Sequence, residues 1–221
     1  MRNSIDHNGR RPGRRLVLGA AIASVAWPSM GHAQGAGQVL EAQKPVSDLY
    51  DALRAIMQLG SGGASFQQRF ERLAPVIDRV FDLESILHTS VGLRWSSLDQ
   101  TARQSLFSVF RTFTIASYTA NFDKNNGEKF EVLPQIRSSG DDVIVQSRLI
   151  PSGGDAVRID YVMRGGAMGR QVVDVLLNGS ISRVAVQRSD FRSLLASGSA
   201  TPLIDSLRRK VTDLSGGTMR S

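Results

Sequence analysis

The chain has 221 residues, 41% of them hydrophobic and 21% charged, which is ordinary for a globular protein with a substantial core. It has no cysteine, which excludes disulfide bonds and cysteine-based zinc sites. The formal net charge is +7, but residues 1–33 hold five of the 27 basic residues and one of the 20 acidic ones, so the remainder carries only +3. With 6% aromatic residues and no long run of Lys and Arg in that remainder, the composition argues against nucleic-acid binding.

The N-terminal segment has the three parts of a cleavable export signal. Basic residues within 10–15 precede an apolar stretch at 16–26, and the small residues at 31–33 form a cleavage site. The apolar stretch has about 11 residues, whereas a membrane-spanning helix needs about 20. We therefore predict that residues 1–33 are a signal peptide, that cleavage follows Ala33, and that the protein is exported to the periplasm.

Two export routes fit this segment. The pair Arg14-Arg15 followed by Leu16 resembles a twin-arginine motif, which directs the export of folded proteins, and it fits equally an ordinary Sec signal with an Arg-rich start. An uncleaved N-terminal anchor is a third interpretation. In each case the remaining chain is exported.

Residues 38–123 show the apolar spacing of helices. After a loose terminus at 34–38, we expect a helix from Val39 with a break near Pro45. A second helix follows the cap residue Ser65 and is kinked or restarted at Pro75.

Two more helices complete this half of the chain. Asp82 caps a short one, and a capping box of Ser97 and Gln100 opens the longest one, over about 98–122.

The apolar period changes from 3.6 to 2 over residues 128–181, which is typical of strands. Gly-rich turns separate four alternating segments, so we expect an antiparallel meander with strands at 128–137, 142–150, 156–164 and 170–178. Two helices within 183–214 close the chain, and Thr201 caps the second. The order of helices, strands and helices predicts an α+β fold in which helices cover one face of a curved sheet and leave an apolar gap.

Residues able to do chemistry are few. His88 is the one histidine after residue 33. The sequence contains no Gly-x-Ser-x-Gly nucleophile elbow with which a catalytic histidine would act, so we interpret His88 as structural or exposed. Without cysteines or further histidines, no metal site is expected. Asp160 and Asp174 lie within strands, where a buried carboxylate acts as a general base in some isomerases, but is more often paired with an Arg or a backbone amide.

Several short motifs occur in an order that is specific to one family. They are Phe81-Asp82, Gly92-Leu93-Arg94-Trp95, a long helix ending near Tyr118, Asp174-Val175, Gly179, Ser182, Arg188-Ser189, Phe191, Leu203-Ile204 and Leu207. In these the sequence resembles the MlaC (toluene-tolerance) family of periplasmic lipid carriers. The resemblance implies a curved NTF2-like sheet with an additional helical subdomain, together forming one lipid-binding domain over residues 34–221. It also implies a phospholipid held by its tails, and exchange with an inner-membrane ABC transporter complex and an outer-membrane lipoprotein and porin complex.

Two departures from the family pattern bear on the ligand. Arg170 stands near the place of a usual Trp, and the stretch from Gly179 to Arg188 is one residue longer than is typical. The string at 174–182 looks more like HpnM, the hopanoid-associated branch, which implies a polycyclic lipid instead of a two-tailed phospholipid. The resemblance therefore leaves two lipid classes open.

We expect apolar side chains to line the lipid-binding site. We also expect the protein to bind the lipid as a monomer, without a cofactor or a metal. Each candidate also fits plain core packing. The candidates are Phe81, Leu87, Leu106, Phe110, Phe113, Val145, Ile159, Tyr161, Val173, Val175 and Leu177. Two other functions remain open, which are a small-molecule enzyme of the isomerase type on a cone-shaped sheet, and an envelope scaffold protein that binds no lipid.

Overall fold

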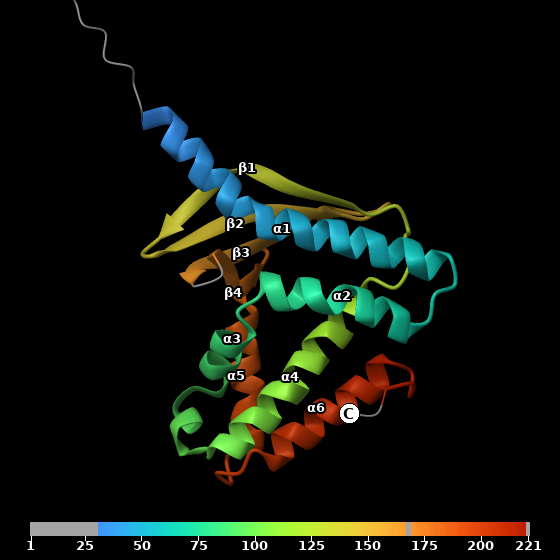
Figure 1. The fold of residues 1–221 in the computed structure, drawn as a ribbon, viewed down its shortest axis with the longest axis vertical. Coiled ribbons are helices and arrows are strands. Elements are labelled where there is room, and N and C mark those ends of the chain that lie inside the picture. Colours follow the sequence, from blue (N-terminus) through green and yellow to red (C-terminus); the bar gives the residue numbers. More distant parts are fainter. Residues whose placement is uncertain (1–30, 167–168, 220–221) are drawn as a thin grey trace, which may run out of the picture.

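The computed structural model describes residues 31–166 and 169–219, and Figure 1 shows their order of helices, strands and helices. This confirms the predicted α+β fold with an antiparallel curved sheet. Most of the predicted signal peptide lies outside the described residues, and 31–33 form the first turn of helix α1. Within the described ranges, no helix is both long enough and apolar enough to cross a bilayer.

Helices α1 (Gly31–Ser61) and α2 (Phe66–Val80) pack against each other. The expected capping box is present at the start of α2, where Ser65 and Gln68 bond reciprocally. The expected break near Pro45 and the restart at Pro75 are wrong, because both helices continue through these residues, while the alternative of a kink at Pro75 stays a prediction. Burial of apolar side chains on both sides of each proline outweighs the one backbone hydrogen bond that a proline removes. The loose terminus expected at 34–38 is also wrong, since α1 includes it.

Helix α3 (Leu83–Val91) begins after its predicted cap, where the Asp82 carboxylate accepts a hydrogen bond of 2.9 Å from the Ser85 amide. Helix α4 (Gln100–Asn121) does not use the predicted capping box. Its cap is Asp99, which accepts from the Ala102 amide at 2.8 Å, while Ser97 ends a 3₁₀ turn, η1 (Gly92–Ser97). Asp is as good a cap as Ser, so residue type alone does not distinguish Asp99 from the predicted Ser97.

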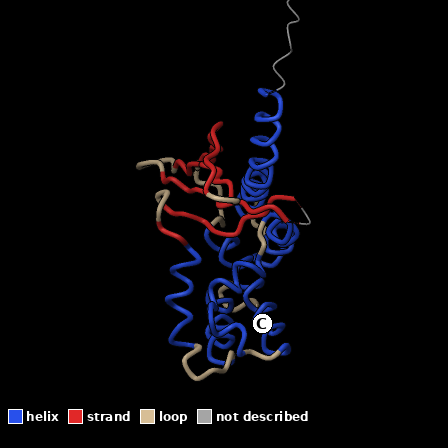
Figure 2. Tube along the Cα trace, turned by 90° about the vertical axis from the view of Figure 1, so that its left-hand side faces the viewer, coloured by secondary structure: helices blue, strands red, loops and turns tan. Residues whose placement is uncertain are grey.

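The five strands form one antiparallel sheet in chain order. They are β1 (Lys129–Ser139), β2 (Asp142–Ile150), β3 (Val157–Gly166), β4 (Gly169–Leu177) and β5 (Ile181–Ser182). The predicted meander is confirmed for the first four strands, whereas β5 has only two residues and too little alternation to be recognised. Figure 2 shows the sheet at one end of the molecule and a group of helices at the other.

The chain ends in helices α5 (Arg183–Leu194) and α6 (Thr201–Leu214). The predicted cap Thr201 is instead the first helical residue of α6, and the preceding Ala200 offers no side-chain cap. Helix α6 lies along α4 (Figure 1), and α5 connects the edge of the sheet to α3 and α6. The main core thus runs continuously from the inner face of the sheet into the helical group.

Candidate functional site

A cavity of about 330 Å³ lies where the sheet meets the helices. This volume is near the lower end of the range of small-molecule sites, roughly 300–1,000 Å³. Its wall is formed by residues from α1, the α2–α3 connection, α3, α4, β1, β3, β4 and α5: Tyr50, Phe81, Leu83, Ile86, Phe110, Phe113, Thr114, Ser117, Tyr118, Asn121, Phe122, Phe130, Ile159, Tyr161, Asp174, Val175, Leu177, Arg183, Val184 and Gln187.

Seven of the eleven residues predicted from the sequence line this cavity. They are Phe81, Phe110, Phe113, Ile159, Tyr161, Val175 and Leu177. Phe81 reaches the wall because residue 81 forms a parallel bridge with Val172 of β4, and the Asp82 amide donates to the Val172 carbonyl at 3.0 Å.

The other four predicted residues do not line the cavity. Leu87, Leu106 and Val145 are fully buried and belong to the packed core. Val173 is the extra residue of a β-bulge. In β3, Val162 pairs with Asp174 and the next residue, Met163, pairs with Val172, so Val173 has no partner in the register. A bulge interrupts the alternation of inward and outward side chains, so Val172 takes the buried place that alternation gave to Val173.

Six aromatic side chains form a continuous part of the wall. Consecutive ring centroids lie 4.8 to 6.3 Å apart, in the pairs Tyr161–Tyr50, Tyr50–Phe130, Phe130–Phe122, Phe122–Tyr118 and Tyr118–Phe81. Such separations are those of favourable aromatic pairs. The sequence analysis did not assign Tyr50, Tyr118, Phe122 or Phe130 to the site, because these residues converge only when α1, α4 and β1 are packed together.

The Tyr50 hydroxyl is hydrogen-bonded to Ser147 Oγ at 2.5 Å, and Ser147 Oγ donates to the Ile159 carbonyl at 2.5 Å. Tyr50 and Ser147 are both buried, and burial raises the pKa of Tyr50. Burial likewise raises the pKa values of Tyr118 and Tyr161, so all three tyrosines stay protonated at neutral pH. These hydroxyls are hydrogen-bonding groups and carry no charge.

Asp174 is the acidic residue of the cavity wall, and its carboxylate is engaged by the protein. One oxygen accepts from the backbone amides of Val175 at 2.7 Å and Val184 at 3.1 Å, and the other accepts from the Ser182 hydroxyl at 2.5 Å. The N-cap of α5 is Ser182, and because the carboxylate accepts from both the Ser182 hydroxyl and the Val184 amide of the first turn, it helps to cap that helix. Its observed role is to fix α5 against the sheet.

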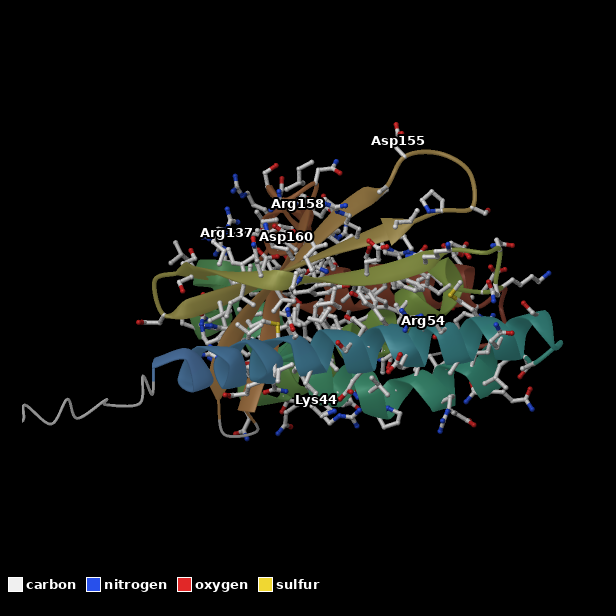
Figure 3. The ribbon with its side chains drawn as sticks, turned by 90° about the horizontal axis from the view of Figure 1, so that it is seen from above. Lys44, Arg54, Arg137, Asp155, Arg158 and Asp160 are labelled. Carbon is white, nitrogen blue, oxygen red and sulfur yellow. The ribbon has the colours of Figure 1, made fainter. Side chains whose placement is uncertain are left out.

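Asp160, the second candidate base, lies outside the cavity. It is fully buried and forms a two-point ion pair with Arg158, with distances of 2.9 and 2.6 Å. Figure 3 shows the pair on the side of the sheet that faces away from α1. His88 is also outside the cavity and packs edge-on against Trp95, with ring centroids 5.4 Å apart. Within the described part of the chain, no three His, Asp or Glu side chains are grouped as metal ligands.

The comparisons with known proteins agree with this architecture. The family model described as MlaC protein matches residues 47–209. A solved structure of a phospholipid-binding protein from Ralstonia solanacearum, in complex with a phospholipid at 1.53 Å resolution, superposes with a TM-score of 0.67. It is 21% identical in sequence, and the match covers 79% of this chain and 98% of that one. No curated protein matches the sequence. Since the family model covers most of the chain, the protein belongs to the MlaC family.

Proposed function

We propose that this protein is a periplasmic lipid carrier, which holds the apolar part of one lipid molecule in the cavity between the sheet and helices α4 and α5. The observation that carries the proposal is the cavity itself, whose wall is dominated by aromatic and aliphatic side chains. Membership of the MlaC family supports lipid binding. The fold shared with a phospholipid-binding protein supports it further.

Burial of hydrocarbon supplies the binding energy in this proposal. Each methylene removed from water contributes about 0.8 kcal/mol, so eight methylenes contribute about 6 kcal/mol. The aromatic wall offers contact area to such a chain without fixing its chemistry, while the headgroup stays near water. A carrier needs this combination, because the lipid must enter and leave without breaking a covalent bond.

The wider role follows from the export signal and the family. We infer that residues 34–221 form one lipid-binding domain, which acts as a monomer after cleavage of the signal peptide. The carrier exchanges phospholipid or hopanoid-like lipid between an inner-membrane ABC transporter complex and an outer-membrane lipoprotein and porin complex. This traffic contributes to the lipid asymmetry of the outer membrane.

Binding is favoured over catalysis by the state of the two acids considered as bases. Asp174 is held by three donors at the start of α5, and Asp160 is paired with Arg158 outside the cavity. A general base must be free to accept a proton from a substrate within hydrogen-bonding reach. Among the described residues, the wall of the cavity therefore offers surface for binding and no free carboxylate for proton transfer.

A cavity-filling variant tests the proposal. The purified protein is incubated with vesicles of phosphatidylethanolamine and phosphatidylglycerol, separated from them, and analysed for retained lipid. Ile159→Trp and Leu177→Trp replace an aliphatic side chain of the wall with a larger indole ring and should reduce retained lipid about tenfold. Leu93→Trp is the matched control, because Leu93 is 89% exposed and is not part of the cavity wall. Equal retention by all three variants would contradict the proposed site.

A further inference from the structure

The sheet carries a row of apolar side chains that begins in the cavity wall and ends in solvent. Ile159 of β3 and Leu177 of β4 are direct partners in the register, and both line the cavity. Leu177 is in turn the partner of Ile181 in the short edge strand β5. Direct partners on neighbouring antiparallel strands lie on the same face, with Cβ atoms roughly 4.5–5.5 Å apart. The three side chains therefore form one apolar row that reaches the edge of the sheet.

Outside the cavity this apolar surface is exposed. Ile181 is 50% exposed, and Val157, which lies two residues before Ile159 and therefore on the same face of β3, is 40% exposed. Six large apolar side chains are exposed among the described residues, and these two lie beside the cavity without being part of its wall. We name Val157, Leu177 and Ile181 the apolar strip. Contiguous exposed apolar surface, unlike scattered single side chains, marks a site of interaction.

The turn between β4 and β5 fixes the edge strand in place. Gly179 has a φ of 73°, and a Cβ at this position would lie 2.9 Å from two atoms of the Arg158 guanidinium, so the turn packs closely on that side chain. The Asn178 amide donates to the Arg158 carbonyl at 2.9 Å. Ile181 thus keeps its place beside Leu177, and the apolar strip is a fixed part of the fold.

The cavity alone is too small for a two-tailed lipid. A dry apolar cavity of about 150 Å³ takes up one benzene molecule, which has six carbon atoms. On the same scale, the volume of about 330 Å³ holds roughly 13 carbon atoms. This is fewer than one palmitoyl chain contains, and far fewer than the two chains of a phospholipid contain. The rest of the hydrocarbon therefore needs apolar surface outside the cavity.

We propose that the apolar strip binds the second acyl chain of a two-tailed lipid, while the first chain occupies the cavity. This inference rests on the proposed lipid-binding function and adds a subsite to it. A chain that leaves the cavity past Leu177 meets Ile181 and Val157 next, so one side of the hydrocarbon stays in contact with apolar side chains. A single-chain lipid with the same headgroup fills the cavity and gains little from the strip.

The test compares two lipids that share a headgroup and differ in the number of chains, which are dioleoyl phosphatidylethanolamine and oleoyl lysophosphatidylethanolamine. The purified protein is loaded from vesicles that contain both, and retained lipid is quantified by mass spectrometry. The double variant Val157→Thr, Ile181→Thr keeps β-branched side chains and so preserves the strands. It should lower the ratio of retained two-chain to single-chain lipid about fivefold, because each residue loses apolar contact. Leu93→Thr, a change at another exposed apolar residue, should keep the wild-type ratio.

A second measurement uses the unmodified protein. Phosphatidylethanolamine that carries a photoreactive diazirine in one of its two chains is bound and illuminated, and the labelled residues are identified by tandem mass spectrometry. Labels should appear both on the cavity wall and on Val157 or Ile181. The single-chain lipid with the same diazirine should label the cavity wall alone.

The outcomes separate this inference from the proposed function. An unchanged ratio in the double variant would overturn the inference, leaving the lipid carrier intact and a protein partner as the occupant of the strip. Retention of the single-chain lipid alone by the wild-type protein would overturn it as well, because no second chain would then be bound. If the wild-type protein retains neither lipid, the proposed function itself fails.

Discussion

The hydroxyl of Tyr50 in α1 lies 2.5 Å from Ser147 Oγ in β2, and this hydrogen bond joins the long N-terminal helix to the sheet beneath the cavity. Ser147 Oγ in turn donates a hydrogen bond to the Ile159 carbonyl in β3. Because Tyr50 and Ile159 both line the cavity, the same contacts hold two of its walls at a fixed separation.

Tyr50→Phe should destabilise the protein by about 1 kcal/mol, the usual loss for one buried neutral hydrogen bond. The cost is moderate because Ser147 keeps its bond to Ile159, so no donor is left unpaired. Urea unfolding measures the change. Tyr118→Phe serves as the comparison, since the Tyr118 hydroxyl has no bonding partner in the described structure, and it should change stability much less. Equal losses in the two variants would contradict the assigned hydrogen bonds.

Asp174→Ala should cost about 2 kcal/mol of stability, because it removes three hydrogen bonds to a charged acceptor that helps the N-cap Ser182 to cap α5. The loss should be local, with faster amide hydrogen exchange in α5 than in α2. Asp205→Ala is a matched control on the surface, where the carboxylate lies 3.7 Å from the Arg208 side chain in a half-exposed pair. A control variant as unstable as Asp174→Ala would show that the capping role is wrong.

The two partners of the Arg158–Asp160 pair should respond unequally to substitution. Arg158→Leu leaves the fully buried Asp160 carboxylate without its partner and should cost about 3 kcal/mol. Asp160→Asn leaves Arg158, whose side chain is 45% exposed, free to be hydrated, so a loss of only about 1 kcal/mol is expected. Chemical denaturation of both variants gives the comparison, and the reverse order of stability would be incompatible with this pairing.

The three tyrosines predict a loss of stability in alkaline solution. Burial raises the pKa values of Tyr50, Tyr118 and Tyr161 in the folded state above the ordinary value of about 10. A group with a raised folded pKa stabilises the fold fully below its unfolded pKa, and this contribution falls as the pH rises towards the folded pKa. The unfolding free energy should therefore decrease above about pH 10. Absorbance titration should show tyrosinate forming together with unfolding. Ionisation of all three tyrosines near pH 10 while the protein stays folded would contradict the raised pKa values.

The sequence was sufficient for the features that depend on local pattern. Alternation located β2 within its observed bounds, and the caps Ser65 and Asp82 were recognised by their residue types and spacing. Six of the seven predicted residues that line the cavity lie on the apolar faces of β3, β4 and α4, which the spacing of apolar residues indicates in the sequence. Local pattern and the family resemblance were therefore sufficient for the fold class and for part of the cavity wall, while the assignment of the cavity as the lipid site stays a proposal.

The remaining features depend on tertiary contacts that no local window contains. Pro45 is tolerated in a continuous helix because α1 is packed along the sheet, and the bulge at Val173 appears only when β4 is aligned with β3. Tyr50 and Phe130 are 80 positions apart in sequence, yet their rings are 4.8 Å apart in the wall.

The central claim is that an intact lipid occupies the cavity of the native protein. The most direct measurement is mass spectrometry of the protein purified from its own envelope without detergent, first intact and then after extraction with organic solvent. One lipid per chain is the expected result, and Ile159→Trp purified in the same way should yield little or none. Repeated recovery of wild-type protein free of lipid, in a folded state that takes up none from vesicles, would contradict the account.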